Sequence, residues 1–147
     1  MEENKKKKIK KLIGWILYLA VLVGLVIGTP KALSYFLDTP YPMAAITSGS
    51  MWPVLKQGDM VLIKGIKGKE DLKIGDVIVY KNPIGFTIHR IIEMREDTLT
   101  TKGDANNVSD SPIGYEEIIG KAVSTDHNPL RIPYLGMISI LLNKNKS

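Results

Sequence analysis

The chain has 147 residues, a formal net charge of +5 and no cysteine. A chain of this length has room for one folded domain, which excludes a multidomain enzyme. The absence of cysteine excludes disulfides, thiolate metal sites and a cysteine nucleophile, and it leaves an oxidising compartment open.

The positive charge is concentrated at the N-terminus, where six of the first eleven residues are lysines. From residue 38 onward, 13 Lys and Arg are balanced by 13 Asp and Glu. A formally neutral domain lacks the basic surface on which nucleic-acid binding depends. We therefore expect no nucleic-acid partner, and we interpret residues 1–11 as a cytoplasmic basic segment.

An uncharged apolar segment, LIGWILYLAVLVGLVIG, runs from Leu12 to Gly28. Its 17 residues lie at the short end of the range that spans a bilayer, and Thr29 with Pro30 is expected to end it. We predict a retained anchor in membrane lipid, with residues 29–40 as a linker. A cleaved secretory signal is the alternative, but its apolar core is usually shorter and ends in a small-x-small site, which matches only weakly here.

The lysine-rich flank also predicts the orientation of this anchor. Segments rich in Lys and Arg stay on the cytoplasmic side, and only Lys31 lies close to the far end. We expect a single-pass protein of the cell membrane, with its N-terminus in the cytoplasm and residues 41–147 outside it.

Short apolar runs separated by Gly, Pro, Asn and Asp follow the anchor and predict a compact, mainly β domain. Gly-Asp pairs at residues 58–59 and 75–76 are typical of turns that precede strands. The expected strands are Met60 to Lys64, Val77 to Tyr80, Thr87 to Ile92, Leu99 to Lys102 and Ile118 to Ser124. Residues 132–142 are too few to span a membrane, so we expect a buried strand or an interfacial segment, with a half-inserted tail as the less favoured alternative.

The segment ITSGSMWPVL, residues 46–55, is the first candidate for chemistry. Gly49 permits unusual backbone angles and Pro53 restricts the chain, so Ser50 can be held exposed in a rigid turn. Neighbouring amide N–H groups are then available for an oxyanion hole. Taken alone, a Ser-Gly-Ser triplet such as residues 48–50 is more typical of an ordinary turn or cap than of a nucleophile, and only the rest of the chain favours the catalytic interpretation.

A serine hydroxyl needs a neighbouring base, and the chain has two histidines. His89 lies in a predicted strand whose alternation directs Thr87, His89 and Ile91 to one face. His127 lies in a predicted loop. A single strand histidine is usually structural, so His89 gains a catalytic interpretation only from its neighbours.

A polar loop from residue 101 to 112 contains Asp104 and Asp110. A carboxylate there can hold a histidine in one tautomer and stabilise its protonated form. An exposed Asx-rich turn is the alternative. A calcium loop is disfavoured because the bidentate glutamate and the flanking helices are missing, and we expect neither a metal nor a cofactor.

Three segments in this order behind an anchor resemble the type I signal peptidases. They are the serine box at residues 48–53, the strand box at residues 75–80 and the Gly-Asp-Asn box at residues 103–110. The resemblance extends from Ile46 to Ile140. His89 followed by Arg90 replaces the usual bacterial Lys-Arg pair, as in the branch of the endoplasmic-reticulum, archaeal and spore-former enzymes. Trp52 is unusually bulky for the serine box, and no clear C-terminal transmembrane helix is present.

The resemblance implies a serine endopeptidase that removes signal peptides from exported preproteins after an Ala-x-Ala site. Ser50 would be the nucleophile and His89 the base, with Asp110 favoured over Asp104 as the carboxylate. The Ser50 amide and the Ser48 hydroxyl would form the oxyanion hole. The substrate would add as a strand to an exposed sheet edge. Small pockets would be lined by four residues, for which core packing is the alternative: Ile46, Met51, Leu55 and Ile88.

Two other functions compete with this interpretation. A non-catalytic, membrane-tethered β domain that binds secreted polypeptides would need no reactive serine. A self-cleaving or repressor-type peptidase on a similar fold would use a lysine base and a DNA-binding domain, and the anchor argues against both. Whether accessory subunits take part does not follow from the residues.

Overall fold

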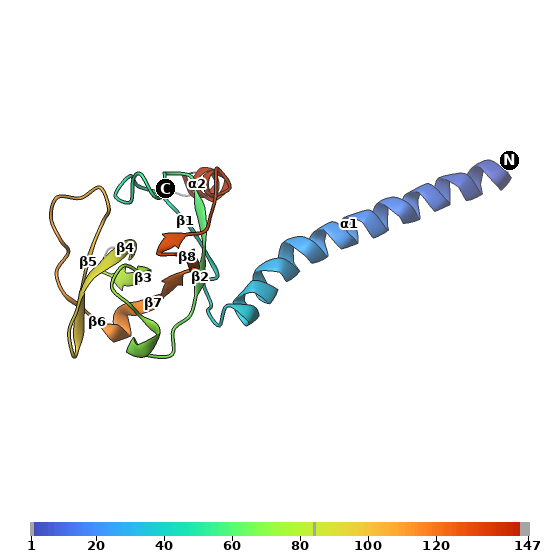
Figure 1. Cartoon of the computed structure of the whole chain (residues 1–147). Helices are drawn as coiled ribbons and strands as arrows, with labels where there is room; N and C mark the ends of the chain where they lie inside the picture. Colours follow the sequence, from blue (N-terminus) through green and yellow to red (C-terminus); the bar gives the residue numbers. More distant parts are fainter. Residues whose placement is uncertain (1, 84, 145–147) are drawn as a thin grey trace. The chain divides into compact units, whose positions relative to one another are not determined.

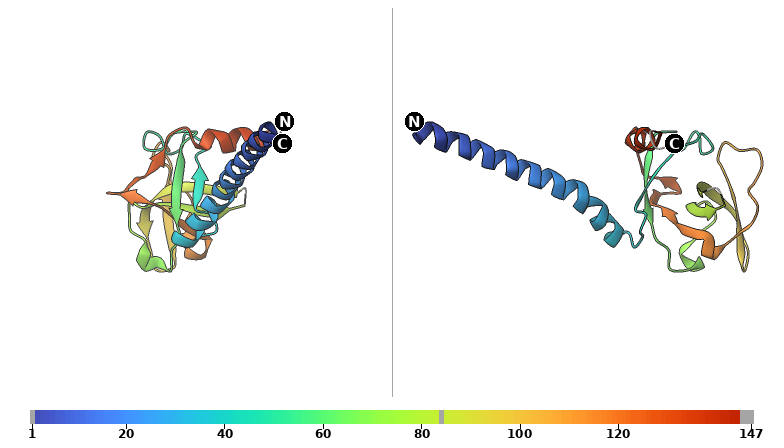
Figure 2. Two further views of the ribbon diagram at one scale, coloured as in Figure 1. Left: turned by 90° about the vertical axis from the view of Figure 1, so that its right-hand side faces the viewer. Right: turned by 180° about the vertical axis from the view of Figure 1, so that it is seen from behind.

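The computed structural model describes residues 2–83 and 85–144, and the chain divides into two compact units, residues 1–36 and 37–147. The first unit is one continuous helix, α1 (Glu2–Phe36), seen in Figure 2. It is long and apolar enough to cross a membrane, and none of its residues is buried.

Helix α1 continues beyond Thr29 and Pro30, the expected end of the membrane-spanning segment. Pro30 lies inside α1, which continues to Phe36, so the first part of the expected linker is helical. A proline lacks the N–H of one helical hydrogen bond, and in a membrane environment neighbouring groups can compensate for that loss. The proline therefore interrupts the hydrogen-bond ladder without ending the helix.

The second unit is built mainly from short strands, as the sequence predicts (Figure 1). All five predicted strands are present, although the last one ends at Ala122 and a separate short strand begins at Ser124. The strands of two or three residues were not predicted, because a segment that short cannot display a recognisable alternation of apolar and polar residues. The strands are β1 (Met43–Ala45), β2 (Met60–Lys64), β3 (Val77–Asn82), β4 (Gly85–Met94), β5 (Thr98–Lys102), β6 (Ile113–Gly114), β7 (Ile118–Ala122), β8 (Ser124–Thr125), β9 (Asn128–Pro129) and β10 (Arg131–Ile132).

The main sheet is antiparallel, in the order β1-β2-β7-β3-β4-β5-β6, with β10 also pairing with β2. A separate hairpin joins β8 and β9. Two single-turn 3-10 helices, Lys69–Asp71 and Tyr115–Glu117, lie in the connections. This order leaves β1 at one end of the sheet, while β4 lies inside it between β3 and β5.

Two core clusters occupy opposite faces of β3. Val77 and Val79 belong to the first cluster, and Ile78 and Tyr80 belong to the second. Successive side chains of a strand point to opposite faces, so a strand buried on both faces is apolar without alternation. This arrangement explains the continuous run VIVY.

The two predicted Gly-Asp turns have the same local geometry. Gly58 and Gly75 adopt φ angles of 91° and 97°, a region that favours glycine. In each turn the following aspartate accepts a hydrogen bond from the backbone N–H three residues before it, at 2.9 Å for Asp59 and 3.1 Å for Asp76. Both turns thus end with a side chain that replaces a missing backbone partner.

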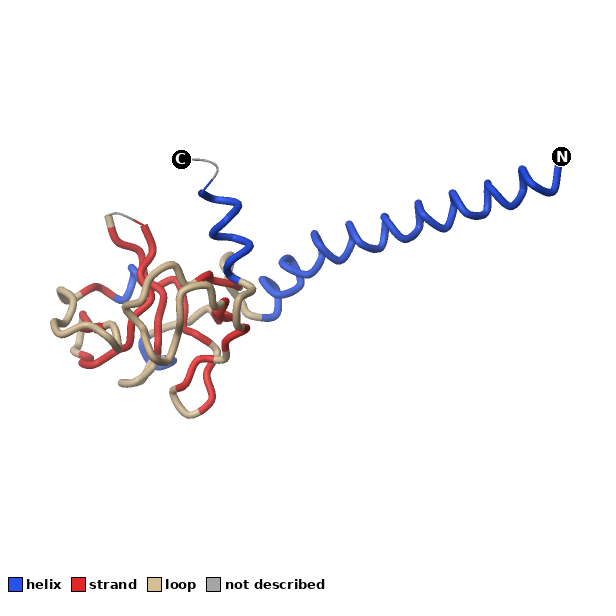
Figure 3. Tube along the Cα trace, turned by 90° about the horizontal axis from the view of Figure 1, so that it is seen from above, coloured by secondary structure: helices blue, strands red, loops and turns tan. Residues whose placement is uncertain are grey.

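The strand expected within residues 132–142 is wrong for most of its length. Only Arg131–Ile132 forms a strand, and a helix, α2 (Gly136–Lys144), follows it (Figure 3). The helix packs against β1, and its first residue lies so close to the backbone of Asp59 that a side chain there would clash. Ile138 and Leu141 of this helix are exposed, as an interfacial segment requires. The interfacial interpretation stays a prediction.

Candidate active site

The serine turn is anchored in the first core cluster on both sides of Ser50. Ile46 exchanges backbone hydrogen bonds with Gly58 and Asp59 and thereby closes the base of the loop. Met51 and Leu55 are both 0% exposed, and the N–H of Leu55 donates to the carbonyl of Met51 at 2.9 Å. Ser50 is therefore fixed by the burial of its neighbours while its own side chain stays accessible.

Gly49 does not have the role expected from the sequence. Its φ lies outside the left-handed region, and a Cβ built there would meet nothing within 4 Å. The backbone angles of this turn are thus open to other residues. The close approach occurs at Gly103, where a Cβ would lie 2.6 Å from the carbonyl oxygen of Ser50.

His89 lies in the middle of β4, directly opposite Ile78 of β3. It is 8% exposed, so its ring is held by packing against neighbouring strands. The alternation predicted for this segment is confirmed, since Ile91 belongs to the second core cluster and Ile88 packs against the first.

The loop after β5 contacts both the serine turn and the histidine strand. The N–H of Ala105 donates to the Ser50 carbonyl at 2.8 Å, and the N–H of Asp110 donates to the Thr101 carbonyl at 2.8 Å. Gly103 permits the first contact because any side chain would collide with the serine turn. The loop thus aligns Asp110 and Ser50 on either side of His89.

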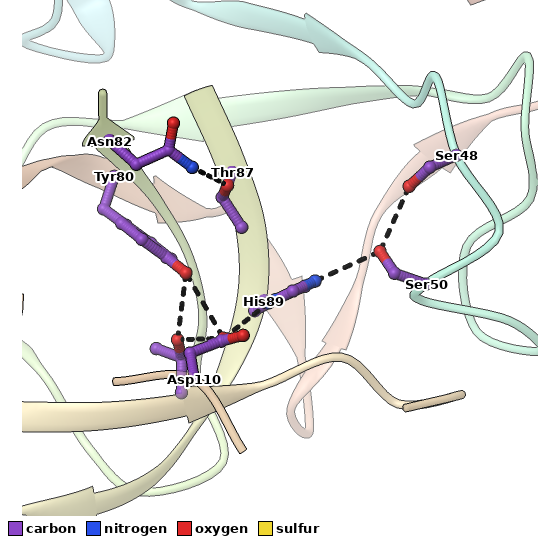
Figure 4. A network of polar contacts seen from close by, with 8 residues as sticks. Ser48, Ser50, Tyr80, Asn82, Thr87, His89 and Asp110 are labelled. Carbon is purple, nitrogen blue, oxygen red and sulfur yellow. Dashed lines mark hydrogen bonds and ion pairs between the residues drawn. The ribbon is translucent and has the colours of Figure 1, made fainter. Parts of the chain in front are cut away.

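Ser50, His89 and Asp110 form a continuous hydrogen-bonded chain (Figure 4). His89 Nδ1 lies 2.6 Å from Asp110 Oδ2, and His89 Nε2 lies 3.1 Å from Ser50 Oγ. An ionised carboxylate only accepts hydrogen bonds, so Nδ1 carries the proton and Nε2 presents a lone pair to the serine hydroxyl. This tautomer allows the ring to take the serine proton.

The two groups expected to form the oxyanion hole lie next to this chain. Ser48 Oγ is 3.1 Å from Ser50 Oγ. Because Ser50 donates to His89 in the tautomer above, Ser48 donates to Ser50. Within the described part of the chain, the N–H of Ser50 donates no hydrogen bond. Both groups therefore lie beside the Ser50 hydroxyl, and their role as oxyanion donors stays a prediction.

Asp104 does not reach His89. Its carboxylate receives two hydrogen bonds from Arg90, at 2.8 Å from Nε and 2.7 Å from Nη2. The remaining Arg90 nitrogen donates to the carbonyls of Gly75 and His127. Asp104 therefore holds the loop against three segments of the domain, and only Asp110 faces the histidine.

A cavity of about 290 Å³ opens beside Ser50 and His89. A second cavity of about 390 Å³ shares five lining residues with it and is bordered by Ser139 of α2. The residues common to both are Ala44, Ala45, Thr47, Val79 and Phe86. Small side chains of β1 thus form one wall of a continuous groove that leads to the serine.

The four residues expected to line the substrate pockets divide into two groups. Ile88 lines the cavity beside Ser50. Ile46, Met51 and Leu55 are at most 2% exposed, belong to the first core cluster and do not line either of these two cavities. Their position is that of core residues under the serine turn.

Several residues at the site were not identified from the sequence. Ala44 and Ala45 come from a strand of three residues, too short for its pattern to be recognised. Asn106 lines the cavity from the acidic loop, and Phe86 borders it from β4. Within residues 2–83 and 85–144, no cluster of three or more His, Asp and Glu side chains is arranged to hold a metal ion.

Comparison with known proteins gives a consistent set of relatives, although no family model matches the chain. The signal peptidase complex catalytic subunit sec11 of Sclerotinia sclerotiorum is 30% identical over 145 residues, which cover 88% of this chain and 80% of that protein. The subunit SEC11 of Fusarium vanettenii is 32% identical over 130 residues, covering 78% and 72%. The subunit SEC11 of Tuber melanosporum is 26% identical over 161 residues, covering 94% and 83%.

Proposed function

The chain belongs to the family of signal peptidase complex catalytic subunits, and we propose that Ser50, His89 and Asp110 are the triad with which it removes signal peptides from preproteins. It is a membrane-bound serine hydrolase of the signal peptidase type. The observation that carries the proposed triad is the hydrogen-bonded chain from Asp110 through His89 to Ser50.

The proposed reaction starts with neutral His89. Ser50 Oγ attacks the scissile carbonyl carbon while His89 Nε2 accepts its proton, and Asp110 stabilises the imidazolium that forms. The tetrahedral oxygen receives hydrogen bonds from the Ser50 N–H and the Ser48 hydroxyl. His89 then protonates the leaving amine, and a water molecule repeats the sequence on the acyl-enzyme.

The preprotein is proposed to add as a strand to the free edge of β1. The carbonyl of Pro42 accepts a hydrogen bond from Ile63, and the N–H of Ile46 donates to Asp59. Antiparallel pairing alternates, so the backbone groups of Met43 and Ala45 point away from β2. They are therefore available to a substrate strand that runs along the groove toward Ser50.

Specificity for small residues follows from the walls of this groove. Ile88, Val79 and Phe86 enclose the cavity next to the nucleophile. A branched or aromatic wall excludes larger side chains sterically, whereas alanine enters without a clash. The proposed cleavage site is therefore of the Ala-x-Ala type.

The proposed topology is a single pass through the cell membrane with the N-terminus in the cytoplasm. The lysine cluster before the apolar part of α1 supports this orientation. The domain would then lie outside the cytoplasm, close to the membrane that holds the signal peptide of its substrate.

The test is cleavage of a preprotein with an Ala-x-Ala site by the full-length protein in detergent. Wild type should cut after the second alanine, as shown by sequencing the new N-terminus. Ser50→Ala and His89→Ala should lose activity at least a thousandfold while remaining folded.

Matched controls separate this chemistry from general damage. Ser111 is exposed and lies outside the site, and the side chain of His127 is 55% exposed. Ser111→Ala and His127→Ala should keep nearly full activity. A folded Ser50→Ala variant that still cleaves, or that still reacts with a serine-directed probe, would contradict Ser50 as the nucleophile. A folded wild-type protein that neither cleaves nor reacts with the probe would favour a binding domain.

A further inference from the structure

One carboxylate oxygen of Asp110 receives three hydrogen bonds, of which only one comes from the histidine (Figure 4). Thr101 Oγ1 donates to Oδ2 at 2.6 Å, the same distance as His89 Nδ1. The hydroxyl of Tyr80 donates to the same oxygen at 3.2 Å. The oxygen that orients His89 is thus itself oriented by two hydroxyl groups.

These two hydroxyls approach from the strands on either side of the histidine strand. Tyr80 belongs to β3 and Thr101 to β5, and both strands pair with β4. Thr101 also binds Asp110 through its backbone carbonyl, at 2.8 Å from the Asp110 N–H. Thr101 therefore holds the carboxylate of Asp110 through its side chain and the backbone of Asp110 through its main chain.

Burial makes both donors rigid. Thr101 is 0% exposed and Tyr80 is 5% exposed, so packing fixes their side chains. The Asp110 side chain is 24% exposed and lies in a loop, where a carboxylate would otherwise rotate toward water. Hydrogen bonds to a charged group are also stronger than those between neutral groups.

Both hydroxyls are able to donate at the same time. Thr101 Oγ1 lies 3.4 Å from the Tyr80 hydroxyl and 2.6 Å from Asp110, so its single proton goes to the nearer carboxylate. Burial, with the nearby charge of Asp110, raises the pKa of Tyr80 above 10.0 and keeps its phenol protonated. Tyr80 therefore remains a donor throughout the range in which a neutral histidine acts as a base.

We propose that Thr101 and Tyr80 are positioning residues, which fix Asp110 Oδ2 in line with His89 Nδ1 and thereby set the tautomer and orientation of the imidazole. This inference rests on the proposed triad. Neither hydroxyl contacts Ser50 or lines the cavity beside it. Their loss should therefore lower kcat and leave substrate binding unchanged.

The experiment compares variants that separate the hydroxyl from its shape. Thr101→Val keeps the shape and removes the donor, whereas Thr101→Ser keeps the donor and removes a methyl group. Thr101→Val should lower kcat about 10- to 100-fold, the effect of losing a hydrogen bond to a charged group, with KM within twofold. Thr101→Ser should restore most of kcat. Tyr80→Phe, with its longer bond, should lower kcat about three- to tenfold.

Thr100→Val is the matched control for burial. Thr100 is the neighbour of Thr101 in β5, is 8% exposed and points to the other face. This variant should keep wild-type kcat. Thermal unfolding establishes that each variant is folded, and Tyr80→Phe provides the test if Thr101→Val does not fold.

A second readout separates failure of this inference from failure of the proposed function. The rate constant for labelling by a serine-directed probe reports the nucleophilicity of Ser50 without any preprotein. It should fall in Thr101→Val and Tyr80→Phe in parallel with kcat, and labelling should be absent in Ser50→Ala. If Ser50→Ala loses labelling while folded Thr101→Val labels at the wild-type rate, or if Thr101→Ser is as impaired as Thr101→Val, the inference is wrong although the serine is active.

Discussion

Replacing Asp110 and Asp104 one at a time tests which carboxylate serves the histidine. Asp110→Asn keeps the shape of the side chain and removes its charge. Because three donors converge on Oδ2, the asparagine oxygen rather than its NH₂ group should occupy that position. The His89 tautomer is then retained, and the main loss is the attraction between the imidazolium and the carboxylate.

The size of this loss follows from the geometry. The contact between Nδ1 and Oδ2 is 2.6 Å, and charge delocalisation places the two charge centres roughly 4 Å apart. Two unit charges at that separation near a protein surface attract each other by about 4 kcal/mol. Asp110→Asn should therefore lower kcat by ~10³-fold.

Asp104→Asn should have the opposite profile. It breaks a two-point contact with Arg90, in which the side chains are 20% and 16% exposed. Loss of this partly buried pair should lower the free energy of unfolding by about 2 kcal/mol and Tm by roughly 8 °C. Because Asp104 does not contact the histidine, kcat should change by less than about tenfold.

The assay is preprotein cleavage under saturating substrate, with thermal unfolding of each variant measured in the same detergent. The Asp110→Asn variant should be inactive and stable, and the Asp104→Asn variant active and less stable. If folded Asp104→Asn lost ~10³-fold in kcat while Asp110→Asn stayed active, the assignment of the carboxylate drawn from these distances would be wrong.

Three further predictions concern the site. Gly103→Ala places a Cβ 2.6 Å from the carbonyl oxygen of Ser50 and should lower the free energy of unfolding by about 1–3 kcal/mol. Gly49→Ala, where a Cβ meets nothing within 4 Å, should leave Tm unchanged, and equal Tm values for the two variants would refute this packing argument. Ile88→Ala enlarges the cavity beside Ser50 and should raise kcat/KM for substrates with valine before the cut relative to alanine, measured by competition between the two. The raised pKa of Tyr80 stabilises the folded state below about pH 10, and this contribution is lost as pH rises through the folded pKa. The phenolate absorbance difference between wild type and Tyr80→Phe should titrate above pH 10.0, and a lower midpoint would exclude a buried donor.

Much of the β domain was predictable because its strands carry their own local signals. Met60 to Lys64 is bounded by a Gly-Asp turn and forms a strand with the expected limits. The strand boundary at Ala122 was missed because only Val123 separates β7 from β8 and no turn residue lies between them. Helix α2 was missed because a short, mainly apolar segment such as residues 132–142 is compatible with either a strand or a short helix.

The sequence also identified Ser50, His89 and two acidic candidates, because the three segments that contain them occur in the order found in the type I signal peptidases, although each segment alone is compatible with a structural role. The contacts between them depend on the tertiary structure. Ser50 and His89 are 39 residues apart in the chain, and His89 and Asp110 are 21 residues apart. A hydrogen bond over such a separation depends on strand pairing and loop packing rather than on neighbouring residues.

The sequence by itself determined an apolar helix at the N-terminus, a mainly β domain and the family to which the chain belongs, since hydrophobic pattern and motif order are properties of the chain alone. Only the tertiary structure decided that Asp110 faces His89 while Asp104 pairs with Arg90. It also decided that Met51 and Leu55 are core residues and that Thr101 and Tyr80 reach the carboxylate. The physical reason is that burial and hydrogen-bond geometry depend on which strands become neighbours, and residue order does not specify that pairing directly.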